Sequence, residues 1–226
     1  MPNWVTNTLT IECDDRDLLL GVGARLRAPV PAIDENGVQT LRDTEFSFWN
    51  IVAPTDLEAY HSVCDSVGMQ NRDNWYNWNN RNWGSKWDAN MHFARVEEGK
   101  LIYDFDTPWA PPVQAIETLA EQYPELTITL RYVEEQGWGG ETIFQGNEID
   151  EVETWDIPES HEEAMHAFNH CYRCDDIGSL YEDCPEAIAS QSHFRDIELL
   201  GECRWCEINE DGRYDDCPED ERAPQP

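Results

Sequence analysis

The order of the periodic segments constrains the fold of this chain more than any other feature of its sequence. Alternating apolar residues predict strands over 4–13, 91–96, 100–106 and 126–133, and a further strand from Thr142. Helices are expected over 18–26, after Asp14-Asp15, and again after Pro111-Pro112, where the apolar residues fall on one stripe. The order strand, helix, strand, strand, helix, strand is that of the ferredoxin-like split βαββαβ arrangement, in which two helices cover one face of an antiparallel sheet. We therefore predict an α+β fold.

The segment 28–85 separates the first predicted helix from the hairpin and interrupts this pattern. It shows little periodicity and is rich in Asn and Trp. A structureless loop of this length is unusual inside a compact domain. We therefore predict an insertion that folds over the sheet and is anchored by its tryptophans. Residues 1–157 are expected to form the ferredoxin-like domain and residues 158–226 a small Cys-rich module.

The chain is strongly acidic, with 47 Asp and Glu residues against 15 Lys and Arg and a formal net charge of −32. Such a surface repels nucleic-acid phosphates, so we expect no direct nucleic-acid binding. Two interpretations of the charge stay open: halophilic adaptation, in which salt screens the self-repulsion, and imitation of nucleic-acid phosphates on the basic groove of a target. No apolar run approaches the roughly 20 residues of a membrane helix, and no secretory signal is recognisable. We expect a cytoplasmic protein without membrane contact, and its oligomeric state stays open.

Several blocks of sequence resemble a known family. The residues that carry the resemblance span about 1–150, and they are Pro2–Trp4 with Asn7 and Leu9, Asn82–Ala89, Phe105–Pro112, Tyr123-Pro124 and Arg131–Glu135. In these blocks the chain is similar to the YubB-like group of phage and plasmid proteins, which have a ferredoxin-like domain. The resemblance implies this fold and an origin on a mobile element, and it brings no activity with it.

The C-terminal module carries a repeated cysteine pattern, two Cys-x-x-Cys knuckles that are each followed by Cys-Pro-Glu. The six cysteines are Cys171, Cys174, Cys184, Cys203, Cys206 and Cys217. A knuckle presents two thiolates at tetrahedral spacing, so we predict structural zinc. One ion held by the four knuckle cysteines is one arrangement. The other is one ion per repeat, with Cys184 or Cys217 as third ligand and His170 or His193 as a candidate fourth. Unmetallated thiols, disulfides and redox chemistry are the alternatives.

A second group of residues combines tryptophan rings with amides and a scarce lysine. The candidates for ligand or partner binding are Trp83, Lys86, Trp87, Asp88 and Trp109. Aromatic rings beside amides form stacking pockets for small ligands or hot spots for protein partners. The same pattern is also typical of rings that attach an insertion to a sheet, with Lys86 paired to Asp88 or placed over a ring face.

Catalytic motifs are not recognisable: no histidine lies in a nucleophile motif, and no Gly-rich phosphate loop precedes a helix. We therefore predict no catalytic residue. The function expected first is that of a non-enzymatic interaction protein of a phage, virus or plasmid, which inhibits or modulates a host or defence protein. The alternative is a protein that binds or processes a small ligand or nucleotide in the region around Lys86.

Overall fold

The computed structural model describes residues 2–33, 39–61 and 73–168. The chain divides into two units, Met1–Ile157 and Pro158–Pro226. The strands of the first unit are β1 (Trp4–Glu12), β2 (Val30–Ile33), β3 (Gln39–Arg42), β4 (Asn90–Glu97), β5 (Lys100–Pro108), β6 (Thr127–Glu134), β7 (Gly139–Gln145) and β8 (Glu148–Trp155). Its helices are α1 (Arg16–Leu26), the 3-10 helix η1 (Phe48–Asn50), α2 (Leu57–Tyr60), α3 (Trp75–Asn82) and α4 (Val113–Gln122), and the second unit begins with α5 (His161–Phe168). None of the helices in the described ranges is long and apolar enough to cross a membrane.

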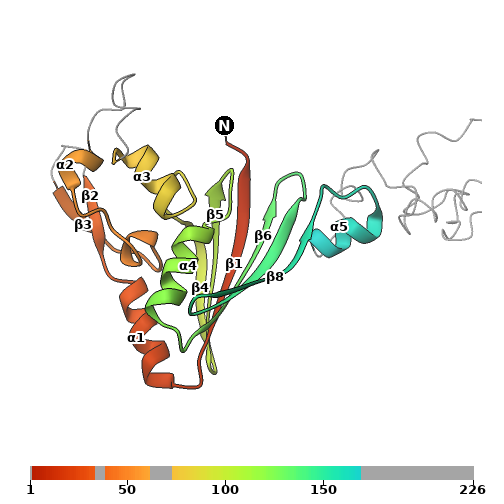
Figure 1. Ribbon diagram of the computed structural model, residues 1–226, viewed down its shortest axis with the longest axis horizontal. Helices are drawn as coiled ribbons and strands as arrows, with labels where there is room; N and C mark the ends of the chain where they lie inside the picture. Colours follow the sequence, from red (N-terminus) through yellow and green to blue (C-terminus); the bar gives the residue numbers. More distant parts are fainter. Residues whose placement is uncertain (1, 34–38, 62–72, 169–226) are drawn as a thin grey trace, which may run out of the picture. The chain divides into compact units, whose positions relative to one another are not determined.

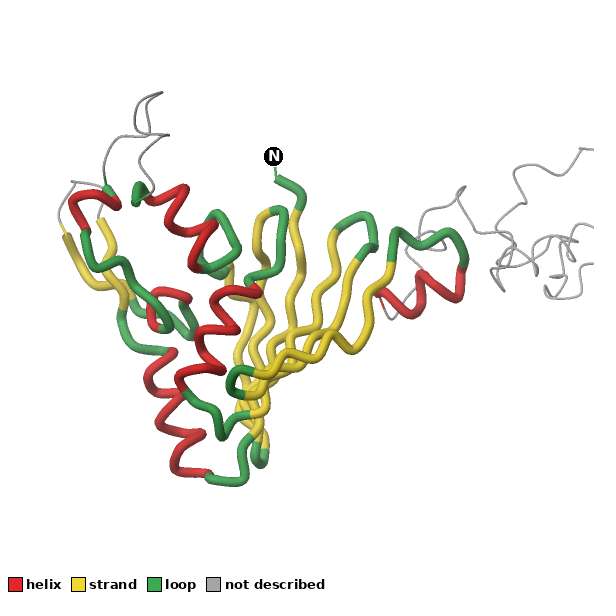
Figure 2. The backbone as a smooth tube through the Cα atoms, in the orientation of Figure 1, coloured by secondary structure: helices red, strands yellow, loops and turns green. Residues whose placement is uncertain are grey.

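A six-stranded antiparallel sheet in the order β4-β5-β1-β6-β7-β8 forms the framework of the first unit (Figure 1). In the middle of the sheet, Leu9 of β1 lies opposite both Tyr103 of β5 and Leu130 of β6. Helices α1 and α4 cover the face to which these side chains point (Figure 2). The α+β fold with an antiparallel sheet is therefore confirmed. The order β4-β5-β1-β6 is the one expected for the split arrangement, while β4 and β8 form the two edges of the sheet.

The predicted helices begin and end for local reasons that the sequence contains. The Asp15 side chain accepts hydrogen bonds from the backbone N–H groups of Asp17 and Leu18, which caps the start of α1. Helix α4 follows Pro112, whose fixed φ suits a helix start, and it ends before Pro124, which cannot continue the hydrogen-bond ladder. Both helices carry their apolar residues on the side that faces the sheet.

The β7–β8 hairpin differs from the prediction in two respects. The strand expected from Thr142 begins earlier, since Gly139 and Gly140 already belong to β7. A Cβ atom at Gly139 would lie 2.3 Å from the Tyr132 carbonyl oxygen and 2.7 Å from the Trp155 ring, so glycine permits a close approach there. Strand β8 was not predicted, because its exposed and largely acidic sequence lacks the alternation of a half-buried strand.

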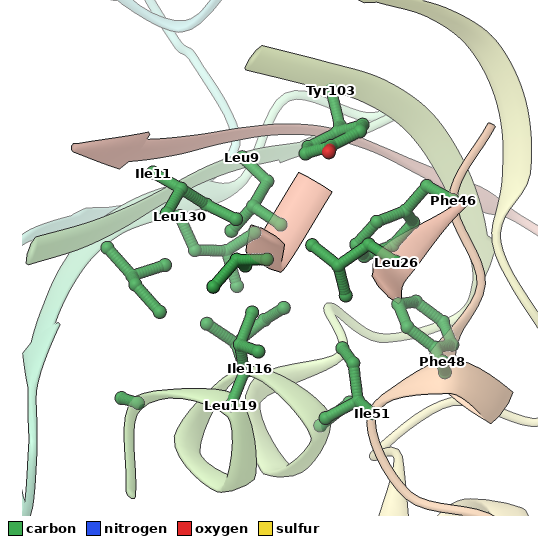
Figure 3. Close-up of a cluster of buried hydrophobic side chains, with 14 of the residues drawn as sticks. Leu9, Ile11, Leu26, Phe46, Phe48, Ile51, Tyr103, Ile116, Leu119 and Leu130 are labelled. Carbon is green, nitrogen blue, oxygen red and sulfur yellow. The ribbon is translucent and has the colours of Figure 1, made fainter. Parts of the chain in front are cut away.

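The insertion supplies a large part of the hydrophobic core (Figure 3). The ring of Phe46 stacks on Phe105 of β5 with centroids 5.2 Å apart, and Phe48 meets the same ring edge-on at 5.7 Å. Trp78 and Trp83 are also buried in this core. The insertion thus folds over the sheet, but two phenylalanines that the sequence analysis did not single out make its ring contacts with β5.

A short segment, the Asn50-Ile51 strap, ties the insertion to both helices. The Arg25 guanidinium donates hydrogen bonds to the carbonyl oxygens of Asn50 and Ile51, at 3.1 and 3.2 Å, and to the Tyr123 hydroxyl at 2.8 Å. The Asn50 amide in turn donates to two carbonyls at the C-terminal end of α1, at 2.9 and 2.7 Å. These bonds satisfy carbonyl groups that would otherwise lack partners at the end of a helix.

Candidate functional site

A cavity of about 690 Å³ lies in the insertion, between the β2–β3 hairpin and the segments around α2 and α3. Five aromatic rings contribute to its walls: Trp49, Tyr60, Trp75, Trp83 and Trp87. Its polar lining includes Arg42, His61, Asn79 and Asp88. The volume falls within the range of roughly 300–1,000 Å³ that is typical of small-molecule sites, which combine mostly apolar walls with a few polar groups.

The inner walls of the cavity are held in place by ring-to-ring packing. Trp83 is only 2% exposed, and its ring contacts Trp49 and Phe48 with centroids 6.4 and 5.9 Å apart. Its indole N–H donates to the Val52 carbonyl oxygen at 3.0 Å. Tyr60 packs edge-on against Trp49 at 5.5 Å. Edge-to-face packing of this kind is favourable for aromatic pairs, so the inner walls are fixed before any ligand binds.

Asp88 connects the cavity to the backbone of the insertion. One carboxylate oxygen accepts hydrogen bonds from the backbone N–H groups of Phe48 and Ala89, at 2.8 and 2.9 Å, and the other accepts from the Ser47 hydroxyl at 2.5 Å. Burial raises the pKa of Asp88, while these hydrogen bonds and the nearby Arg42 guanidinium act in the opposite direction. The carboxylate therefore has a fixed position, and it lines the cavity from there.

Lys86 lies against a cage of three rings, formed by Tyr76, Trp87 and Trp109. Its ammonium nitrogen is 4.7 Å from the ring centroids of Trp87 and of Trp109, and 5.8 Å from that of Tyr76. Each distance is within the roughly 6 Å of a cation–π interaction. Trp109 has a φ of 65°, in the left-handed region that non-glycine residues rarely adopt. Its backbone N–H is held by the Asn3 carbonyl oxygen at 2.9 Å.

The structure brings the five predicted binding residues into one neighbourhood but divides them between two features. Trp83, Trp87 and Asp88 line the cavity, whereas Lys86 and Trp109 belong to the Lys86 cage. The Trp87 ring takes part in both. Lys86 lies over ring faces, while the Asp88 carboxylate bonds to Ser47, Phe48 and Ala89.

The sequence analysis missed most of the other lining residues of the cavity, among them two rings and two polar side chains. Trp49 and Tyr60 are aromatic residues of the same insertion, so a count of rings over its whole length would have included them. Arg42 and His61 carry no signal in the sequence, because only the fold brings β3 and the end of α2 beside Asp88.

The predicted zinc ligands lie outside the described residues, which end at Phe168. Within the described ranges, no group of three or more His, Cys, Asp or Glu side chains is placed to hold a metal ion. Cys13 is the one free cysteine there, and it is partly buried. The zinc site therefore stays a prediction.

Residues 82–175 match a family model described as the ferredoxin-like domain in Api92-like protein. In chain order this stretch runs from the end of α3 through β8 and α5. A ferredoxin-like domain is thereby confirmed. The matched residues begin within the insertion and extend beyond the blocks of sequence that resemble the YubB-like group. The match does not test the resemblance to that group itself.

One solved structure is similar to this chain, the crystal structure of protein api92 from Yersinia pseudotuberculosis. The two share 10% sequence identity with a TM-score of 0.41, over 70% of this chain and 99% of that one. The search of curated proteins found no match.

Proposed function

We propose that the first unit is a binding module that takes up a small organic ligand with a planar ring in the cavity of the insertion. The observation that carries this proposal is the cavity itself, about 690 Å³ in volume and walled by five aromatic rings. Sites of this size and lining bury most of the surface of a small ligand. Planar rings stack favourably on tryptophan faces, and the nearby polar groups orient them.

The walls differ in how much they can contribute to binding. Trp83 is buried and fixed by its neighbours, so it supplies a rigid back wall. Trp75 is partly exposed and Trp87 is 39% exposed, so their ring faces have area left to cover. Asp88 supplies a fixed acceptor beside them. We therefore assign the stacking to Trp75 and Trp87 and the orientation of the ligand to Asp88.

A thermal-shift screen of the full chain with indoles, nucleosides and flat heterocycles tests this proposal. A ligand at about 100 times its Kd is expected to stabilise the unit by about 2.7 kcal/mol and to raise its melting temperature accordingly. Trp75→Ala is expected to abolish the shift, and the free variant is expected to melt at a somewhat lower temperature because the Trp75 ring packs partly against the core. Trp138→Ala is the matched control, because Trp138 is a partly exposed tryptophan that packs on Tyr132 and is not a cavity residue. A shift that survives Trp75→Ala would contradict the proposal.

The interaction-protein hypothesis uses part of the same surface. Trp87 and Trp109 are 39% and 49% exposed, and exposed tryptophans are enriched in the hot spots of protein interfaces. The partner, a host or defence protein, would then cover these rings. If no compound in the screen shifts the melting temperature, this second function becomes the better supported one.

We also propose that the Cys-rich module of residues 158–226 holds one or two structural zinc ions. The full chain, purified without chelator, is expected to contain zinc by elemental mass spectrometry. Cys171→Ser should remove all of it if the four knuckle cysteines share one ion, and half of it if each repeat holds its own. Cys13→Ser is the control, and it should leave the zinc content unchanged. A metal-free chain with its cysteines paired as disulfides would refute the proposal.

A further inference from the structure

We propose that the ligand of the cavity is an organic cation, an ammonium group carried on a flat apolar body. This inference rests on the proposed function and specifies the charge of the ligand. Aromatic faces are electron-rich and attract cations, and rings that enclose a cavity are the usual means of recognising an alkylated ammonium group. Here five rings surround one cavity, and a carboxylate lies among them.

The same part of the molecule already holds one cation in this way. The Lys86 ammonium lies 4.7 Å from the Trp87 centroid and 4.7 Å from the Trp109 centroid. In a chain with 47 acidic residues, no carboxylate of the described residues pairs with this lysine, which lies against rings. Trp87 also lines the cavity. The Lys86 cage is therefore an internal example of the interaction that we assign to the ligand.

The charges around the cavity favour a cation over an anion. Asp88 lines the cavity, and hydrogen bonds from Ser47, Phe48 and Ala89 fix the position of its carboxyl group. Arg42, the opposing charge, is exposed, and it is attached to a two-stranded hairpin rather than to the main sheet. The formal net charge of −32 adds a field that concentrates cations near the surface and repels anions.

Besides Arg42, His61 is the cavity residue whose side chain can carry a positive charge. It is exposed and packs edge-on against Tyr60, with ring centroids 5.2 Å apart. All affinities are therefore compared at one pH, so that His61 is in the same state in every titration. The comparison then isolates the opposing effects of Asp88 and Arg42.

Three indoles of nearly equal size test the charge of the ligand: tryptamine (a cation), tryptophol (neutral) and indole-3-acetate (an anion). Their affinities for the full chain are measured by isothermal titration calorimetry at pH 8. We expect tryptamine to bind about tenfold more tightly than tryptophol, the size of a favourable cation–π contact combined with a carboxylate. Indole-3-acetate is expected to bind most weakly of the three.

Two substitutions identify the groups responsible. Asp88→Asn keeps the shape and an acceptor for the Phe48 N–H, and it is expected to remove most of the tenfold preference for tryptamine over tryptophol. Arg42→Gln changes an exposed side chain and should not affect folding. It is expected to strengthen tryptamine binding and to weaken that of indole-3-acetate.

The outcomes separate this inference from the proposed function. Equal affinities for the three indoles, or tightest binding of indole-3-acetate that Arg42→Gln abolishes, would overturn the cation assignment and leave the binding module standing. No binding of any of the three, together with no response in the thermal-shift screen, would overturn both.

Discussion

Replacing Trp83 with alanine is expected to lower the free energy of unfolding by about 3–5 kcal/mol, the range for deletion of a large buried aromatic side chain. Trp83 is 2% exposed, and it contacts three rings from two parts of the insertion: Phe48 and Trp49 of η1, and Trp78 of α3. Its removal leaves a void among side chains that cannot collapse easily. It also removes the indole N–H that donates a hydrogen bond to the Val52 carbonyl oxygen.

Urea unfolding followed by near-ultraviolet circular dichroism measures this loss, because the signal reports on packed aromatic rings. Trp109→Ala is the matched control: it removes the same side chain from a site where the ring is 49% exposed. The control is expected to cost less than about 1.5 kcal/mol, since only the contacts with Lys86 and Trp87 and partial burial are lost. Equal losses for the two variants would mean that Trp83 is not part of the core of the unit.

Arg25→Met is expected to be the second most destabilising change, with a loss of about 2–4 kcal/mol. Methionine keeps the apolar stem but removes every donor, and hydrogen bonds from charged groups contribute about 1.5–3 kcal/mol each when their partners stay buried. The carbonyls of Asn50 and Ile51 and the Tyr123 hydroxyl would lose the guanidinium together. The Asn50-Ile51 strap would then be tied to α1 mainly through the Asn50 amide.

Arg25→Lys and Arg16→Met complete this experiment, again measured by urea unfolding. Lysine cannot reproduce a planar fork that reaches three acceptors, so Arg25→Lys should recover less than half of the lost stability. Arg16 is an exposed arginine at the start of the same helix, and its replacement is expected to change stability by less than about 0.5 kcal/mol. Equal stability of Arg25→Met and Arg16→Met would refute the role of Arg25 in holding the strap.

The sequence analysis predicted those parts of the fold whose cause is local. Leu9 and Ile11 alternate because one face of β1 is buried, and Asp15 stands where a helix needs a cap. Strand β8 was missed because its stability comes from pairing with β7 rather than from an apolar face. The roles of Phe46 and Phe48 were also missed, because nothing in their neighbourhood shows that they pack on a distant strand.

The candidate site was predictable only in part, for the same reason. Trp83, Trp87 and Asp88 are close in sequence and stand out as a group, so a local pattern was enough to find them. Arg42 and Tyr60 enter the cavity from other elements of the insertion. Their proximity to Asp88 is a product of tertiary packing, which periodicity and composition do not encode for an irregular segment.

The position of β8 at the edge of the sheet has a consequence for how concentrated solutions of this protein behave. Half of its residues are acidic, namely Glu148, Asp150, Glu151 and Glu153, and two exposed apolar side chains, Ile149 and Val152, lie among them. No further strand of the described residues pairs with this edge. An edge of this kind invites strand-to-strand aggregation, which like charges oppose. Charge repulsion weakens when carboxylates are protonated and when salt screens them. Acidification and high ionic strength therefore remove the protection of this edge, and purification and storage at neutral pH and low salt preserve it.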